Sequence, residues 1–256
     1  MNTPGQIAQS YIEIGVGKAD TPKGKMFLLA VLAGMFIAFA GVAATAGNAV
    51  VNKLAGACIF PAGLAMVTVA GSELFTGNNL MIIPVMEKRL SVKKLLLAWL
   101  IVYLGNFVGS ILVAVASVAG GVFGAYYETL IATAAAKVSL GFGEAIVRGI
   151  LCNILVCTAV WMAFAAKEPA GKILGLYFPI MVFVICGFEH CVANMFYLPA
   201  GLLAAGKYGV AETGLTWGAC FGKNLLPVTL GNMIGGVGMG LVFWAIHLRD
   251  RVKETV

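Results

Sequence analysis

Long apolar runs alternate with short charged segments along most of this 256-residue chain. A helix needs about 20 mainly apolar residues to cross a bilayer, and six runs are long enough. The predicted spans lie at approximately 26–50, 58–84, 93–120, 140–166, 173–205 and 224–248. The remaining residues are too few for a second domain, so we expect an all-α integral membrane protein.

The second and fifth predicted spans share an interrupted pattern. One contains Gly71-Ser72-Glu73-Leu74-Phe75-Thr76-Gly77-Asn78 after Phe60-Pro61, and the other contains Gly187-Phe188-Glu189-His190-Cys191-Val192-Ala193-Asn194 after Phe178-Pro179. In both, a glutamate follows the glycine by two residues, and an asparagine follows the glutamate by five. Interrupted spans at matching positions of two halves indicate broken helices that line a transport site near the membrane midplane.

A second match supports an internal repeat. The pattern Leu-Gly-Asn-x-x-Gly begins at Leu104 in the third span and at Leu230 in the sixth. Each half then has three spans, and this odd number forces the halves into opposite orientations. We expect one channel domain with repeats at 26–137 and 138–248, a cytoplasmic N-terminal segment at 1–25 and a cytoplasmic tail at 249–256.

Composition and charge agree with a membrane location. Hydrophobic residues make up 61% of the chain and charged residues 11%, whereas soluble domains have about 25% charged residues. Twelve lysines and arginines fall on the side of the termini and four on the other, which predicts cytoplasmic termini in a cell membrane. The net charge of +6 is therefore explained by membrane orientation, and we expect no nucleic-acid partner.

The first 25 residues lack the apolar core of a signal peptide. Thr3-Pro4 is typical of a helix start, and Ile7, Tyr11 and Ile14 share one helical face. The segment is therefore either a short helix on the cytoplasmic membrane interface or a disordered tail.

The motifs around Glu73 and Glu189, with Asn224-Leu225-Leu226-Pro227-Val228-Thr229-Leu230-Gly231-Asn232, resemble the signatures of the formate/nitrite transporter family. The resemblance covers essentially the whole chain in the right order. It implies an aquaporin-like fold of six helices with the second and fifth broken, and a homopentamer with one pore per protomer. It also implies transport of small monovalent anions such as formate, nitrite, hydrosulfide or lactate. Cys191 stands where many relatives have a hydroxyl residue, and the chain looks somewhat closer to the hydrosulfide and nitrite branches.

His190 is one of only two histidines and lies in the middle of the fifth span. An ionisable group at this depth is costly and indicates function, so we expect a neutral imidazole that donates a hydrogen bond or a proton to an arriving anion. A purely structural link between helices is the alternative. The resemblance places Thr76 opposite this histidine, where its hydroxyl can contact substrate. His247, at the end of the sixth span, is expected to be interfacial.

Free carboxylates on the pathway would repel an anion. Glu73 and Glu189 are therefore expected to accept backbone N–H bonds released by the helix breaks, or to pair across helices. Asn78 and Asn194 are expected to give similar structural support through their amide groups.

The resemblance also assigns the apolar constrictions. It places Leu64, Leu74 and Phe75 at the cytoplasmic one and Phe60, Val156 and Phe183 at the external one, while ordinary helix packing is the alternative for each residue. Two apolar slits around a polar chamber would exclude hydrated ions and could gate by dewetting.

Charged residues near the fourth span complete the candidates. The resemblance places Lys137, in the third loop, close to the pore, where its charge would gather anions; an ordinary interfacial lysine is the alternative. Glu144 and Arg148 have helical i, i+4 spacing and are expected to neutralise one another.

Other functional classes fit less well. The six cysteines form no Cys-x-x-Cys pair or zinc ligand set, and neither a P-loop nor a dinucleotide fingerprint occurs in the sequence, so we expect no enzyme, metal or cofactor. Two alternatives to an anion channel remain open. One is a proton-coupled anion symporter, which could use the same histidine. The other is a channel for neutral solutes, although the sequence lacks the asparagine-proline-alanine boxes of aquaporins.

Overall fold

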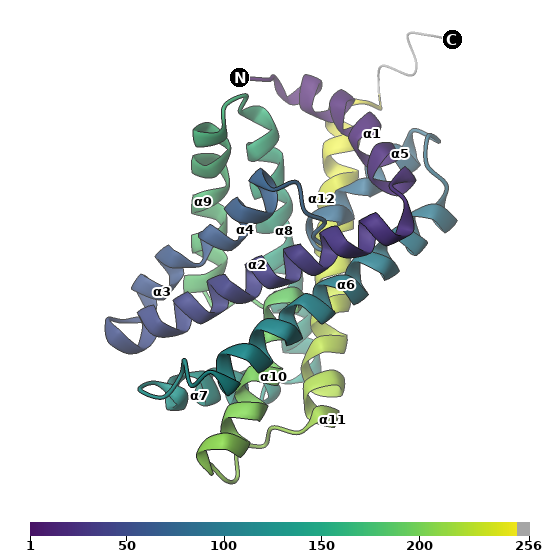
Figure 1. Cartoon of the computed structure of the whole chain (residues 1–256). Coiled ribbons are helices and arrows are strands. Elements are labelled where there is room, and N and C mark those ends of the chain that lie inside the picture. The colour runs from purple at the N-terminus through teal and green to yellow at the C-terminus, as the bar shows by residue number, and fades with distance from the viewer. Residues whose placement is uncertain (250–256) are drawn as a thin grey trace.

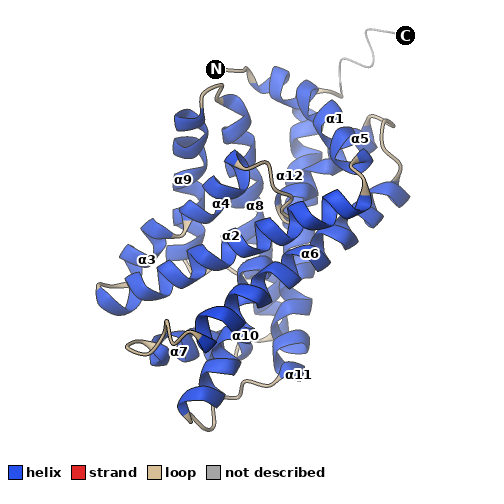
Figure 2. Cartoon of the chain, in the orientation of Figure 1, coloured by secondary structure: helices blue, strands red, loops and turns tan. Residues whose placement is uncertain are grey.

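The computed structural model describes residues 1–249, which form helices and connecting segments with no strand among them (Figure 2). The elements in chain order are α1 (Pro4–Asp20), α2 (Lys23–Val50), α3 (Lys53–Ile59), α4 (Pro61–Val69), the 3-10 helix η1 (Gly77–Met81), α5 (Ile82–Met86), α6 (Val92–Ala119), α7 (Tyr127–Val138), α8 (Phe142–Ala165), α9 (Pro169–Ile185), α10 (Cys191–Tyr208), α11 (Trp217–Ala219), the π-helical turn η2 (Cys220–Leu225) and α12 (Leu226–His247).

Four of the described helices are long and apolar enough to cross a membrane. They are α2, α6, α8 and the continuous helix Trp217–His247, made of α11, η2 and α12. The other two predicted spans are divided: α4 ends well before η1, and α9 ends before α10. The second and fifth spans are therefore broken as predicted. Figure 1 shows the half-helices α4 and α9 side by side, next to the long helices α2 and α8.

The Leu-Gly-Asn-x-x-Gly motifs explain how the long helices pair, since α2 packs on α6 and α8 on α12. A Cβ atom at Gly109 would collide with the backbone of Val31 on α2, and one at Gly235 with the backbone of Ile150 on α8. Small residues allow such close backbone contact between membrane helices. The same motif thus closes the corresponding helix pair in each half.

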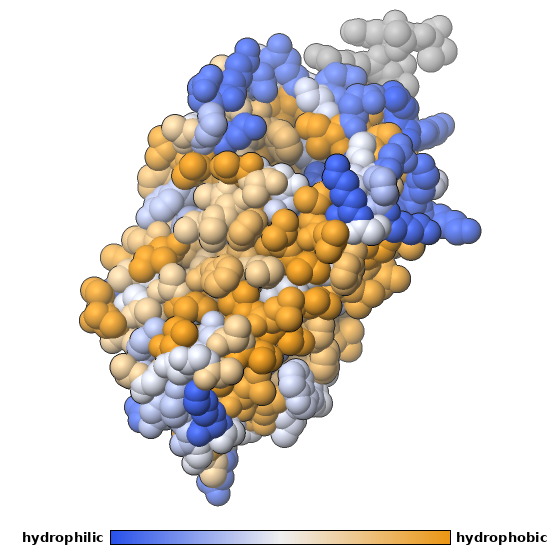
Figure 3. Space-filling model, in the orientation of Figure 1, coloured by the Kyte–Doolittle hydropathy of each residue, from blue (hydrophilic) through white to orange (hydrophobic). Residues whose placement is uncertain are grey.

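On the face shown in Figure 3, a broad apolar belt lies between two polar ends. Large apolar side chains are also exposed along α6, including Leu97, Leu100, Leu104 and Leu112. An exposed apolar surface of this extent requires lipid or another apolar surface as its neighbour. The fold is that of a multi-pass membrane protein.

The N-terminal segment is helical. The hydroxyl of Thr3 accepts from the Gln6 N–H, and the Gln6 side chain accepts from the Thr3 N–H, which is a complete capping box. Its apolar face, including Ile7 and Tyr11, does not lie on the lipid interface as expected. It packs on protein, in a cluster with Leu80 and other residues of η1, α5 and α8.

The predicted third loop contains the helix α7, and Lys137 lies in its last turn rather than in a loop. The tail at 249–256 lies outside the described residues except for Arg249.

Candidate functional site

Each broken span stops at a glycine in a left-handed conformation. Gly71 has φ of 66° and Gly187 has φ of 71°, which an L-amino acid rarely adopts. The next residue in each case donates its N–H back to the preceding helix: Ser72 to Val67 O at 3.0 Å, and Phe188 to Phe183 O at 3.0 Å. The two glycines of the repeated pattern are thus helix terminators.

Asn106 and Asn232, the asparagines of the two Leu-Gly-Asn motifs, satisfy the backbone of the breaks. Asn106 Oδ1 accepts from the Phe75 N–H at 2.9 Å, and Nδ2 donates to the carbonyls of Ala30 and Glu73. Asn232 Oδ1 accepts from the Cys191 N–H at 2.8 Å, and Nδ2 donates to the carbonyls of Gly149 and Glu189. Each fully buried amide therefore binds three backbone groups at membrane depth.

The two glutamates pair across helices. Lys18 Nζ lies 2.8 Å from Glu73 Oε2, and Lys137 Nζ lies 2.9 Å from Glu189 Oε1. Both carboxylates thus form ion pairs across helices, whereas backbone N–H groups at the breaks are bound by the asparagines of the α6 and α12 motifs.

Amide side chains complete the coordination of the carboxylates. Asn78 donates to Glu73 at 2.7 Å, and Asn194 donates to Glu189 at 2.6 Å. Asn224 also donates to Glu189, at 3.1 Å. Asn78 and Asn194 thus contact the two glutamates, and their role in supporting the broken helices stays a prediction.

His190 is the N-terminal cap of α10 and is 3% exposed. Its Nδ1 accepts from the Ala193 N–H at 3.0 Å, and its Nε2 lies 2.9 Å from Thr76 Oγ1. Because Nδ1 is an acceptor, the neutral ring carries its proton on Nε2. The imidazole therefore donates toward Thr76, on the other broken helix.

Asn153 and Asn79 hold the Thr76 segment in place. Asn153 Nδ2 donates to Thr76 O at 3.2 Å and to Asn79 Oδ1 at 3.0 Å, and Asn79 Nδ2 donates to Phe75 O at 3.2 Å. These two residues were not predicted. An asparagine within an apolar span is a usable signal for such a role, because a polar group there needs a partner.

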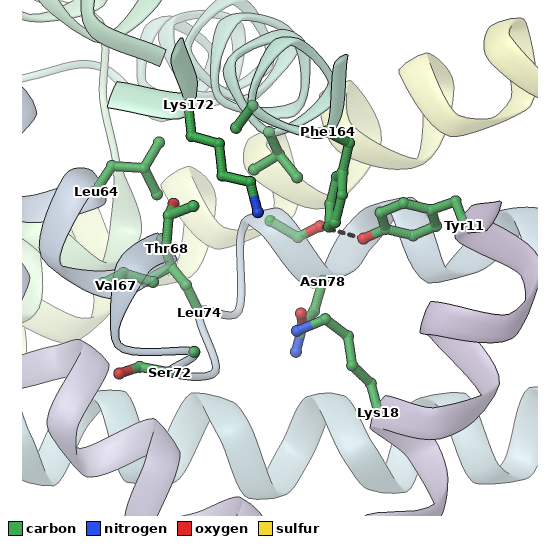
Figure 4. Close-up of a pocket in the computed structure, with 14 residues that line it drawn as sticks. Tyr11, Lys18, Leu64, Val67, Thr68, Ser72, Leu74, Asn78, Phe164 and Lys172 are labelled. Carbon is green, nitrogen blue, oxygen red and sulfur yellow. Dashed lines mark hydrogen bonds between the residues drawn. The ribbon is translucent and has the colours of Figure 1, made fainter. Parts of the chain in front are cut away.

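Three cavities lie in series along the molecule. The N-terminal vestibule, on the side of α1, has a volume of about 250 Å³ and is lined by residues that include Tyr11, Lys18, Thr68 and Lys172 (Figure 4). The opposite vestibule has a volume of about 430 Å³. Between them lies a central chamber of only about 10 Å³, room for one water molecule, with His190 in its wall.

Apolar side chains separate these cavities. Leu64 and Leu74 line both the N-terminal vestibule and the central chamber. Phe60 and Phe183 line both the chamber and the opposite vestibule, and their rings meet edge to face with centroids 5.8 Å apart. Their positions match two constrictions around one chamber.

The other predicted constriction residues differ in position. Val156 lines the central chamber. Phe75 packs instead against Trp99 and Tyr103 of α6, with ring centroids 6.2 and 5.0 Å away, so its ring supports the broken helix from behind. Its role in a constriction stays a prediction.

The remaining candidates are paired or stacked. Lys137 lines the opposite vestibule, but Glu189 offsets its charge there. Arg148 pairs with Glu144 at 2.6 Å, as the helical spacing predicted. His247 stacks on Trp161 near the end of α12.

Comparison with known proteins gives consistent matches. The model of the formate/nitrite transporter family matches residues 5–245. The uncharacterized transporter YrhG of Bacillus subtilis is 39% identical, with 99% of this chain and 97% of YrhG aligned. The formate channel FocA of Escherichia coli K12 is 36% identical over 96% of this chain and 95% of its own. The solved structure of a pentameric formate channel with formate bound is 35% identical, covers 89% of this chain and 98% of its own, and superposes with a TM-score of 0.77.

Proposed function

Because the chain belongs to the formate/nitrite transporter family, we propose that it is a membrane channel for small monovalent anions of weak acids, with formate as its first candidate substrate. The observation that carries this proposal is the central chamber. His190 lines this chamber, which lies between a constriction formed by leucines and one formed by phenylalanines. The name of the relative FocA, a formate channel, supports the same substrate class.

The geometry suits an anion that must lose its water. A bare monovalent ion pays several kcal/mol of desolvation in an apolar environment. His190 offers an N–H donor beside the central chamber, and Thr76 offers a hydroxyl 2.9 Å from that ring nitrogen. Both can bind a carboxylate oxygen that has left the water of a vestibule. The apolar constrictions on either side of the chamber exclude larger hydrated ions.

The structure represents a closed pore. A chamber of about 10 Å³ holds one water molecule but not the three heavy atoms of formate. To cross the pore, an anion therefore requires the leucine pair and the phenylalanine pair each to move apart in turn. Because each pair separates one vestibule from the chamber, opening one pair at a time would keep the pathway closed to continuous water flow.

The charge distribution supports an orientation. We place the N-terminal vestibule at the cytoplasm and the opposite vestibule outside a cell membrane, because lysines and arginines favour the cytoplasmic side. We also place the chain in a homopentamer with one pore per protomer, by analogy with the pentameric formate channel that it resembles. The apolar face of α6 supplies surface for lipid or a neighbouring subunit.

Flux into liposomes that contain the purified protein tests the function. Formate, nitrite, hydrosulfide and chloride are compared across a range of pH and membrane potential. We expect formate flux well above chloride flux and above that of protein-free liposomes. Flux that follows the proton gradient, rather than the formate gradient and the potential, would favour proton-coupled symport. Fast water flow without anion flux would contradict the proposal and favour a neutral-solute channel.

A further inference from the structure

The N-terminal vestibule contains two lysines in different electrostatic states. Lys18 binds both carboxylate oxygens of Glu73, at 2.9 and 2.8 Å. Lys172 also lines the cavity but forms an ion pair with no carboxylate among residues 1–249. Figure 4 shows Lys172 extending into the cavity from the side opposite to Lys18. Of the two lysines that line this vestibule, Lys172 is therefore the one whose charge no carboxylate among the described residues offsets.

The opposite vestibule has the same arrangement. Lys137 is paired with Glu189, and Arg148 is paired with Glu144. Lys53 lines the cavity as well, and among residues 1–249 no carboxylate pairs with it. A Cβ atom on Gly187 would lie 4.0 Å from Lys53 Nζ, so this ammonium group lies at the break of the fifth span.

The two lysines lie at similar places in the fold, near the starts of the two broken segments. Lys53 is the first residue of α3, which begins the first broken span, and Lys172 is in the first turn of α9, which begins the second. Each vestibule therefore contains one lysine that is neutralised by a glutamate and one that forms no ion pair among residues 1–249.

We propose that Lys172 and Lys53 are the residues that collect substrate anions at the two mouths of the pore, while Lys18 and Lys137 mainly hold the broken helices through their glutamates. This inference rests on the proposed function. An uncompensated charge in a concave mouth raises the local concentration of anions, whereas a lysine bound to a carboxylate adds little net field. Together, the two lysines give the pore one such charge at each mouth.

The test measures formate flux in right-side-out and inverted membrane vesicles, which present opposite mouths to labelled formate. Lys172→Gln should raise KM for formate about threefold at low ionic strength when formate enters from the N-terminal side, with Vmax unchanged. Lys53→Gln should do the same from the other side. Both effects should disappear near 1 M salt, where charges are screened beyond about 3 Å.

Matched controls lose the same charge elsewhere. Lys167→Gln removes an exposed lysine close to Lys172 in sequence, and Lys223→Gln removes an exposed lysine of η2. Neither residue lines a vestibule, so both variants should keep the wild-type KM. Lys172→Arg preserves the charge and should also keep it.

Several outcomes would overturn the inference. A wild-type KM in Lys172→Gln, an equal change in Lys167→Gln, or a defect shared by Lys172→Arg would each do so. A loss of Vmax without a change in KM would place Lys172 in the conducting step instead. These results differ from failure of the proposed function, in which the wild-type protein itself passes no formate from either side.

Discussion

His190 Nε2 lies 2.9 Å from Thr76 Oγ1, across the gap between the two broken helices. The other ring nitrogen, Nδ1, accepts from the Ala193 N–H at 3.0 Å. A doubly protonated ring would need a proton on Nδ1 and would lose that cap. The geometry therefore favours a neutral histidine that donates a hydrogen bond to substrate, rather than one that stores a proton at rest.

The first prediction separates the cap from the donor. In His190→Asn, the shorter side chain can still cap α10, since asparagine is a favoured N-cap residue, but it cannot reach Thr76. Formate flux should fall at least about tenfold, the loss expected when a hydrogen bond to a charged group, worth about 1.5–3 kcal/mol, is removed. The pH dependence of the flux should change, and the preference for formate over chloride should narrow. The measurement is liposome flux from pH 5 to 8, after the oligomer is shown to be intact. Wild-type flux at every pH would show that His190 only holds helices together.

The second prediction concerns the ion pair between Lys137 and Glu189. Lys137→Gln leaves a buried carboxylate without its partner, which costs about 3–5 kcal/mol. The variant should therefore unfold at a lower temperature and admit anions more slowly, because a net negative charge remains at the mouth. The double variant Lys137→Gln with Glu189→Gln should recover most of the stability. If the single variant melts like the wild type, the pair is not a structural support.

The third prediction distinguishes Leu74, which lines the constriction, from Phe75, which packs behind it. Leu74→Ala removes part of the wall between the N-terminal vestibule and the chamber, so larger or better hydrated anions should pass. Phe75→Ala empties a site between Trp99 and Tyr103 and should instead destabilise the protein by about 3–5 kcal/mol. Selectivity and thermal unfolding are measured for both variants. A change in anion selectivity in a stable Phe75→Ala variant would show that Phe75 lines the constriction.

Much of the fold was predictable because the same motifs occur in both halves of the sequence. Glycines at 71 and 187 end a helix in the left-handed conformation. Asparagines at 106 and 232 bind backbone groups that would otherwise lack partners inside the membrane. The breaks in the second and fifth spans could be predicted from these glycines and asparagines. The resemblance to a family then supplied the constriction residues that spacing alone could not.

Other parts depend on contacts between distant segments. The ion pairs join Lys18 to Glu73 and Lys137 to Glu189, and no local pattern marks a partner more than 50 residues away. The helix α7 was missed because it is too short to resemble a span. The protein-facing side of α1 could not be told from a lipid-facing one, because both are apolar.

The fourth prediction concerns the buried amide of Asn232. Asn232→Asp retains an acceptor for the Cys191 N–H but removes the donors to Gly149 O and Glu189 O. Each buried group left without a partner costs about 1–3 kcal/mol, and a carboxylate would add a charge at membrane depth. We expect loss of the folded oligomer in detergent. Asn106→Asp should behave alike, and a stable variant at either position would contradict this role.

The fifth prediction concerns Tyr11, which connects α1 to the segment that follows Thr76. Its hydroxyl donates to Gly77 O at 3.4 Å, and burial raises the pKa of that hydroxyl well above the usual value. Because the folded state holds this proton more tightly than the unfolded state, the stabilisation is present below about pH 10 and is lost as pH rises further. Tyr11→Phe keeps the ring that packs on Phe164 and should cost about 0.5–1.5 kcal/mol at pH 7. In thermal unfolding of both proteins from pH 7 to 11, the gap between wild type and variant should close above pH 10, and the comparison cancels the titration of lysines that both share. A gap that stays constant to pH 11 would show that the hydroxyl of Tyr11 does not bind α1 to the broken helix.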